Sequence, residues 1–362
     1  MPRQKNFKKL VRARAAKTGE SYTAARAHFV TTPPRVVADP DTAALTRILA
    51  VMGRENPHTE LPFTEAFVFG VGGGIGFQYM VFDYQDWTSF AVEARRNVLY
   101  FEGTGFIENA LPQVGMTARV QQLPTPETGE QRIRRALDGR AEILLTLDLA
   151  NVPGHTVDGP YAPHPVTVAQ DGDGVAVLGL PGGRVTMSWS ELVGARWTHA
   201  KKYGGLYQIA RLVDPPELRN AVRHAITRTA ECLTHPSRSR FDGNFGIGGL
   251  RKWATLLTDP KDPKGWPKLC PDETSLRRAF DHVTRGLANG ASRPLYAEFL
   301  NEAAELLEDD TLAGAAETYA DLGRRWVELA ELAARPGTVP ADVAALLPDL
   351  ADAEEAAALA IR

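Results

Sequence analysis

The sequence of 362 residues contains little cysteine and no long apolar run. Its two cysteines, Cys232 and Cys270, are too few for a disulfide-stapled scaffold and fit a reducing compartment. No stretch approaches the roughly 18 consecutive apolar residues of a transmembrane helix, and the first residues carry no apolar segment of the signal-peptide kind. We therefore expect a cytoplasmic protein without a membrane anchor.

What the sequence does contain is the composition of a globular protein. Hydrophobic residues make up 44% and charged residues 23%, which argues against disorder. At roughly 150 residues per domain, the length predicts about two domains.

The net charge of -3 is the sum of two unlike parts. Residues 1–36 hold nine Lys and Arg against one acid, Glu20, so this segment carries +8 and the remainder -11. We predict a basic helical arm over residues 1–36. It could contact a nucleic acid or another anionic partner, or pack on the acidic body within the chain or across a homodimer; we favour packing over nucleic-acid binding.

Residues 37–212 predict an α+β domain with an antiparallel sheet, and residues 213–362 an all-α domain. Apolar spacing predicts a helix over 42–52, and Asp171-Gly172-Asp173-Gly174 predicts a hairpin. Ser188 and Glu191 are spaced as a capping box. Strands are expected over 79–84, 97–101, 141–149, 165–170 and 174–180, short helices over 105–111, 132–137 and 188–196, and longer helices over 218–233, 248–257, 274–287, 294–307, 312–334 and 341–359.

The most unusual stretch is the run GVGGGIGF at residues 70–77. It lacks the Gly-Lys-Ser/Thr ending of a P-loop and the spacing of a dinucleotide-binding loop. Glycines this dense indicate that the backbone closely approaches either a ligand or another segment of the chain. The candidate substrate-binding residues are Gly72, Gly73, Gly74, Phe77 and Tyr161.

His164 and Asp148 are the candidate catalytic residues in the predicted strands. A histidine at a strand edge can act as a general base, although it can also be a structural side chain. Asp148 lies in an apolar strand, where a carboxylate needs a partner. Cys270 could form a nucleophile pair only if the fold brought it to His164. The eight histidines are scattered and no HExxH motif is present, so no metal and no cofactor are expected.

The order of these segments resembles a known family. The run FTEAFVFGVGGGIGFQY, then LDLANVP, PYAPHPVTV and SELVGAR, resembles the N-terminal domain of butirosin biosynthesis protein H. The runs FGIGGLRKWA, KGWPK and GLANGASRPLYAEFLNEAAELL resemble the uncharacterised helical domain that usually follows it.

The resemblance implies a papain-like, cysteine-peptidase-type fold that transfers an acyl group in secondary metabolism. Its butirosin member moves the acyl group from a carrier-protein thioester to an aminoglycoside amine. By this resemblance His164 matches the family histidine and Asp148 the aspartate before the following turn. The partners implied are a small-molecule substrate and an acyl carrier protein or CoA thioester as donor.

Two positions depart from the family pattern. Pro40 and Asp41 stand where the nucleophilic cysteine should precede the first helix, and Gly179 ends the strand where a carboxylate should orient the histidine. Thr42 is the hydroxyl that could replace the thiol. The sequence leaves two hypotheses: an amide-forming acyltransferase that uses His164 as base without a cysteine nucleophile, or a pseudoenzyme that binds a ligand or acts as a scaffold.

Overall fold

The computed structural model describes residues 39–83, 88–94, 105–157, 162–196, 205–235 and 242–362. Internal contacts divide the chain into residues 1–37 and one compact unit of residues 38–362. The predicted basic arm and the predicted strand at 97–101 lie outside the described residues.

A six-stranded antiparallel sheet dominates the first half of this unit, in the order β5-β10-β6-β7-β8-β9. This confirms the predicted α+β class; the papain-like fold stays a prediction. The strands are β5 (Met116–Gln121), β6 (Ile143–Asp148), β7 (Pro163–Asp171), β8 (Gly174–Leu180), β9 (Gly183–Met187) and β10 (Leu206–Arg211).

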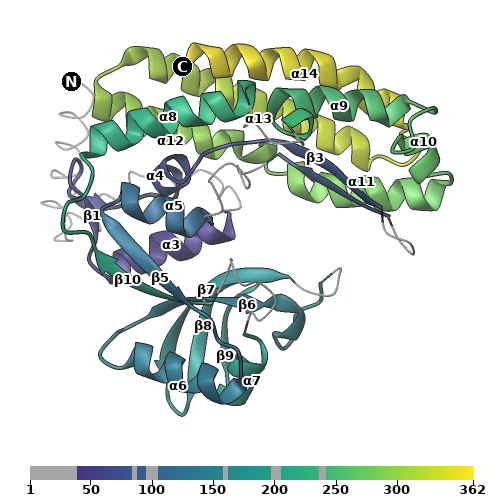
Figure 1. Ribbon diagram of the computed structural model, residues 1–362. Helices are drawn as coiled ribbons and strands as arrows, with labels where there is room; N and C mark the ends of the chain where they lie inside the picture. Colours follow the sequence, from purple (N-terminus) through teal and green to yellow (C-terminus); the bar gives the residue numbers. More distant parts are fainter. Residues whose placement is uncertain (1–38, 84–87, 95–104, 158–161, 197–204, 236–241) are drawn as a thin grey trace, which may run out of the picture. The chain divides into compact units, whose positions relative to one another are not determined.

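The sheet is covered on its two faces by different helices. Alternate residues of β6, β7 and β8 form one buried cluster with α6 (Pro126–Leu137) and α7 (Trp189–Gly194). The other face carries Thr167, whose hydroxyl accepts a hydrogen bond from Arg47 of α3 (Pro40–Val51). The sheet therefore separates α3 from α6 and α7 (Figure 1).

The local sequence signals in this half are confirmed. Asp171 pairs with Gly174 to close the predicted hairpin, and Ser188 and Glu191 form the predicted capping box at α7. The helix expected at 132–137 begins earlier, because Thr125 caps it and Pro126 occupies its first turn. Short helices also form at α4 (Glu65–Val71) and α5 (Phe106–Gln113).

Helices make up most of the second half, as their periodicity predicts. These are α8 (Leu218–Thr234), α9 (Gly246–Thr258), α10 (Trp266–Leu269), α11 (Glu273–Leu287), α12 (Arg293–Leu307), α13 (Asp310–Ala334) and α14 (Pro340–Ala360). The chain also forms two small sheets, β1–β2 (Glu55–Asn56, Leu61–Pro62) and β3–β4 (Gln78–Asp83, Thr88–Glu93), of which β3 packs against α9 and β4 against α11.

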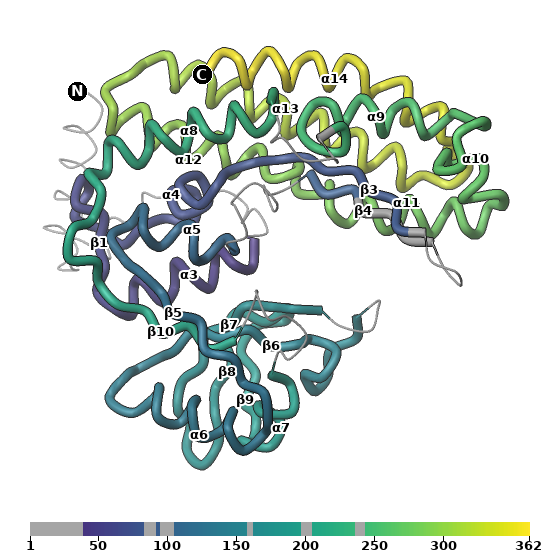
Figure 2. The backbone as a smooth tube through the Cα atoms, viewed as in Figure 1, coloured from purple at the N-terminus to yellow at the C-terminus, as the bar shows by residue number. Residues whose placement is uncertain are grey.

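Strand β10 has an unexpected place in the sheet. It comes after α7 in the chain, yet it lies between β5 and β6 in the sheet; Figure 2 shows it beside β5. The strand pairs with β5 over its whole length, from Leu206 with Gln121 to Arg211 with Met116. With β6 it shares only two pairs, Leu206 with Leu145 and Tyr207 with Leu144. Only Ile143 of β6 remains beyond this last pair, so β10 continues past the start of β6.

Candidate functional site

His164 stands at the beginning of β7, and its side chain is held by the neighbouring strand. The residue is 7% exposed, and its Nε2 lies 2.8 Å from the carbonyl oxygen of Gly179 on β8. A carbonyl oxygen can only accept, so Nε2 carries the proton and donates it. In the neutral ring Nδ1 is then the nitrogen with the lone pair.

The surroundings of His164 favour this neutral ring. Burial lowers the pKa of the imidazole below its ordinary value, and the nearby imidazole of His155 acts in the same direction. The hydrogen bond to Gly179 and the charges of Asp41 and Asp39 oppose the shift. At neutral pH the ring is therefore uncharged, with Nδ1 able to accept a proton.

The electrostatic influence of Asp39 and Asp41 also locates the site. Both residues stand at the start of α3, so the beginning of this helix lies within electrostatic reach of His164. This is where the family resemblance expects the nucleophile, and Asp41 occupies that place with a carboxylate. The sequence has no cysteine at this position.

Thr42, the proposed hydroxyl substitute, is engaged in capping the helix. Its Oγ1 donates to Oδ2 of Asp39 at 3.0 Å, and its backbone N–H donates to the same oxygen at 3.2 Å. The side chain is fully buried. A nucleophilic role for Thr42 stays a prediction, and this arrangement uses its hydroxyl proton for the cap.

Asp148 finds the partners that its burial requires. Its carboxylate accepts from the backbone N–H of Ala162 at 2.7 Å, from that of Ala150 at 3.2 Å and from Asn151 Nδ2 at 3.4 Å. It thereby ties the end of β6 to the residue before β7. Among the described residues no hydrogen bond joins Asp148 to His164, and its proposed catalytic part stays a prediction.

Glu108 on α5 is a residue that the sequence reasoning missed. Burial raises the pKa of this carboxyl, and the charge of Asp41 raises it further. Asp39 and Asp41 stand at the start of α3, and Glu108 of α5 lies within electrostatic reach of Asp41. The only sequence signal for Glu108 was an acidic residue inside the apolar run FIENAL.

The glycine-rich segment, residues 70–77, is packed by the helical half of the chain. A Cβ atom at Gly70 would overlap the ring of Phe299, and one at Gly74 would meet Tyr296 and Thr229 at 2.8 Å. The carbonyl of Gly73 accepts from Thr229 Oγ1 at 3.2 Å. Of the two alternatives left by the sequence, close approach to another part of the chain is therefore realised at these positions.

The remaining candidate binding residues have similar surroundings. A Cβ at Gly72 would overlap the ring of Phe106, and the Gly72 carbonyl accepts from Asn109 Nδ2 at 2.8 Å. Phe77 is 3% exposed and lies between Trp253 and Trp326, with ring centroids 6.2 and 6.1 Å away. Substrate binding by these residues stays a prediction. Tyr161 lies outside the described residues.

The two thiols are buried, Cys232 in α8 and Cys270 after α10. Burial, with the nearby charge of Asp272, raises the pKa of Cys270 to about 11. A thiol with this pKa is almost entirely protonated at neutral pH and is a poor nucleophile. Cys270 is among the groups that influence the pKa of Tyr79 on β3. It is not among the groups that shift the pKa of His164, so nothing in the described part of the chain pairs the thiol with this imidazole.

The residues that the structure describes contain neither a metal-binding cluster nor a membrane-spanning helix. No group of three or more His, Cys, Asp or Glu side chains among them is arranged to hold a metal ion. None of their helices is long and apolar enough to cross a membrane.

Comparison with known families assigns both halves of the chain. No curated protein sequence matches it. Residues 43–178 match the family model described as butirosin biosynthesis protein H, N-terminal, and residues 191–361 match a domain of unknown function, DUF4872. The resemblance predicted from the glycine run and the helical blocks is thus confirmed. The chain is similar to the butirosin biosynthesis protein H N-terminal family over residues 43–178 and to DUF4872 over residues 191–361.

Proposed function

We propose that this protein catalyses acyl transfer to an amine, with Nδ1 of His164 as the general base. The match to the butirosin biosynthesis protein H N-terminal family supports a biosynthetic, acyltransferase-like protein. The observation that carries the catalytic part is the hydrogen bond from Nε2 of His164 to Gly179. It fixes the tautomer and leaves the basic nitrogen at the ring's other side.

The proposed reaction needs no acyl-enzyme. The amine of the acceptor attacks the carbonyl carbon of an acyl thioester, and Nδ1 of His164 takes the proton that the amine loses. The C–S bond then breaks, and the leaving thiolate recovers this proton from the imidazolium. General-base assistance of this kind contributes on the order of 10²–10⁴-fold to the rate.

The Gly179 carbonyl takes the place of the orienting carboxylate in this proposal. A neutral oxygen stabilises the imidazolium less than a carboxylate does, and burial disfavours it further. The base is therefore weak, and it suits a reaction in which the leaving thiolate is itself a good leaving group.

The second candidate function is binding of a metabolite without turnover. The observation that favours it is the capped helix start, where Asp41 stands in the nucleophile's place and the Thr42 hydroxyl is held by Asp39. The acyl acceptor of the first proposal would then be a bound ligand only.

A substitution of His164 tests the proposal. Thiol release from a panel of acyl-CoA and acyl-carrier thioesters is measured with amine acceptors present. We expect His164→Ala to lower turnover by about 100-fold or more, while the melting temperature changes by only a few degrees, roughly the effect of 1 kcal/mol. The matched control is His224→Ala, an exposed histidine on α8, which should keep full turnover.

The pH dependence gives a second readout. Since burial lowers the pKa of His164 below 6.5, the rate should rise with pH through a value below 6.5 and be level at neutral pH. Turnover that persists in His164→Ala contradicts the proposal. A parent protein that binds a metabolite but releases no thiol across the panel establishes the second function instead.

A further inference from the structure

Strand β10 extends past the start of β6, and the space between β10 and residues 139–142, which lead into β6, is called the slot. The two strands share no pair beyond Tyr207 and Leu144, whereas β10 continues beside β5 to Arg211. Successive residues of a strand point to opposite faces, so Tyr207 and Ile209 face one side of the sheet and Gln208 the other. A cavity lies on each side of this slot.

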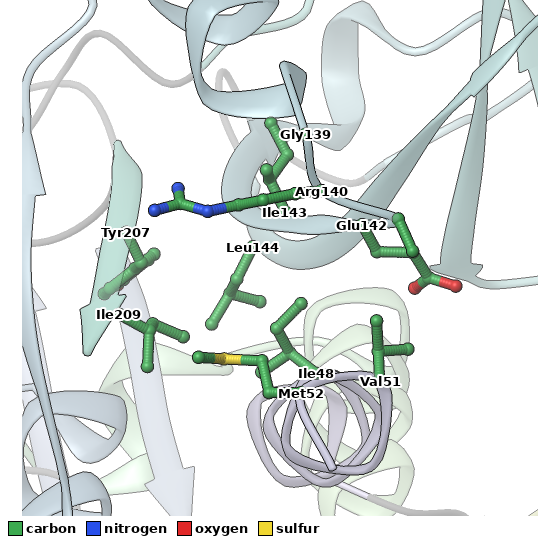
Figure 3. A pocket seen from close by; sticks show the side chains of 11 residues that line it. Ile48, Val51, Met52, Gly139, Arg140, Glu142, Ile143, Leu144, Tyr207 and Ile209 are labelled. Atoms are coloured by element: carbon green, nitrogen blue, oxygen red, sulfur yellow. The ribbon is translucent and has the colours of Figure 1, made fainter. Parts of the chain in front are cut away.

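The cavity on the α3 side is apolar. It has a volume of about 270 Å³, and Ile48 and Val51 of α3, with Met52 directly after this helix, line it opposite Leu144, Tyr207 and Ile209 of the sheet (Figure 3). Val51 and Met52 are 39% and 37% exposed, which is high for side chains of this type. The one acidic residue of its lining, Glu142, is paired with Arg47.

The cavity on the α6 side is cationic. It measures about 470 Å³, and its lining includes Arg132, Arg135 and Arg140 with the amides of Gln121 and Gln208. Asp138 is the single acidic residue that lines it. Arg132 donates to the carbonyl of Gln122, whereas within the described part of the chain the guanidinium groups of Arg135 and Arg140 make no hydrogen bond or ion pair.

The two cavities share residues 139 and 140, the turn that enters β6. Arg140 therefore lies at the boundary between an apolar wall and an arginine-lined one. Guanidinium groups bind phosphate and carboxylate through paired N–H donors, and the amides add neutral donors. An apolar cavity joined to such a cluster matches a molecule with an anionic head and a hydrocarbon tail.

We propose that this slot binds an organic anion with an apolar tail, the phosphate or carboxylate at Arg135 and Arg140 and the tail against Ile48, Met52 and Ile209. The site is separate from the candidate catalytic site. Val51 and Met52 of the slot lie at the end of α3, whereas Asp39 and Asp41, which influence the pKa of His164, lie at its beginning. A helix of 12 residues is about 18 Å long.

Titration calorimetry with defined probes tests this site on the full-length protein. The probes are octyl phosphate and octanoate below their micelle concentrations, with inorganic phosphate and octanol as the head and the tail alone. We expect the two amphiphiles to bind at least tenfold more tightly than either part. The double variant Arg135→Gln/Arg140→Gln should weaken octyl phosphate by about tenfold or more, since it loses two charge-assisted interactions.

Two further variants separate the head from the tail. Met52→Glu should weaken the binding of octyl phosphate and leave the binding of inorganic phosphate unchanged. The control is Arg223→Gln, a substitution of an exposed arginine on α8, which should change neither affinity. Circular dichroism confirms that each variant is folded. The proposal is overturned if neither amphiphile binds, if octanol binds as tightly as octyl phosphate, or if the folded double arginine variant keeps the parental affinity.

Discussion

The glycine-rich segment and His164 are the two features that make this sequence unusual, and the structure treats them in opposite ways. In the segment at residues 70–77, glycines and carbonyl groups contact side chains from elsewhere in the chain. At His164 only one ring nitrogen has a partner among the described residues, and the other is left for a proton. In this protein the glycine-rich segment is therefore occupied by packing, whereas His164 keeps a nitrogen that is available for proton transfer.

This comparison predicts that changes around the glycine-rich segment reduce stability, whereas changes at His164 reduce activity. The largest effect should come from Arg293. This buried residue pairs with Glu354 at 2.7 Å and donates to the carbonyls of Gly76, Ala94 and Ala291. Arg293→Met leaves the Glu354 carboxylate buried without its cation, which should cost about 3–5 kcal/mol in urea denaturation.

The matched control removes both charges. The double variant Arg293→Met/Glu354→Leu should regain much of the lost stability, because no uncompensated charge remains. Trp326, which donates to Glu354 at 2.6 Å, then loses its acceptor, so the recovery should be incomplete. A single variant that loses less than about 1 kcal/mol would show that the pair is unimportant.

The next effect should come from Gly70→Ala. The new methyl group overlaps Phe299, which lies in a packed core at 0% exposure. Overpacking of this kind costs about 1–3 kcal/mol. The control is Gly314→Ala, where the new Cβ meets nothing within 4 Å; it should stabilise helix α13 by up to about 1 kcal/mol. Chemical denaturation measures both, and equal destabilisation by the two substitutions would refute the packing argument.

The smallest effect should come from Glu302 on α12, which accepts from Thr64 at the start of α4 at 2.6 Å. Burial, together with Glu298 and Glu305, raises the pKa of Glu302 to about 7. The folded protein therefore binds this proton more tightly than the unfolded chain, and stability falls as pH rises from about 4.5 to 7. Glu302→Gln should stabilise the protein at pH 8 and give no gain at pH 5, as measured by thermal unfolding. An equal gain at both values would contradict the assigned pKa.

The sequence predicts the helices, one hairpin and the capping box, but it predicts no strand at β4, β5, β9 or β10 and it predicts spatial partners poorly. The hairpin at Asp171 and the capping box at Ser188 depend on a few adjacent residues, so both could be read directly. The helices after residue 216 follow from apolar spacing. By contrast, the partner of Gly70 is Phe299, more than 200 residues away, and no local pattern connects them.

The candidate site divides in the same way. His164 could be identified from its residue type and its place before a strand. Its partner could not, because Gly179 supplies a backbone carbonyl, and every residue has one. Glu108 was missed because its significance comes from burial beside Asp41, which a sequence does not show. The division into domains at residue 212 stays a prediction.

Strand β10 has a consequence for how the chain is made. It belongs to the segment that matches DUF4872, yet it is the strand between β5 and β6 in the sheet that also holds His164. During synthesis the chain emerges from its first residue onward, so β5 and β6 are available long before β10 exists. Until residue 211 has been made, β5 has no neighbour in this sheet. The segment that matches DUF4872 therefore supplies the strand through which β5 joins the other strands of this sheet.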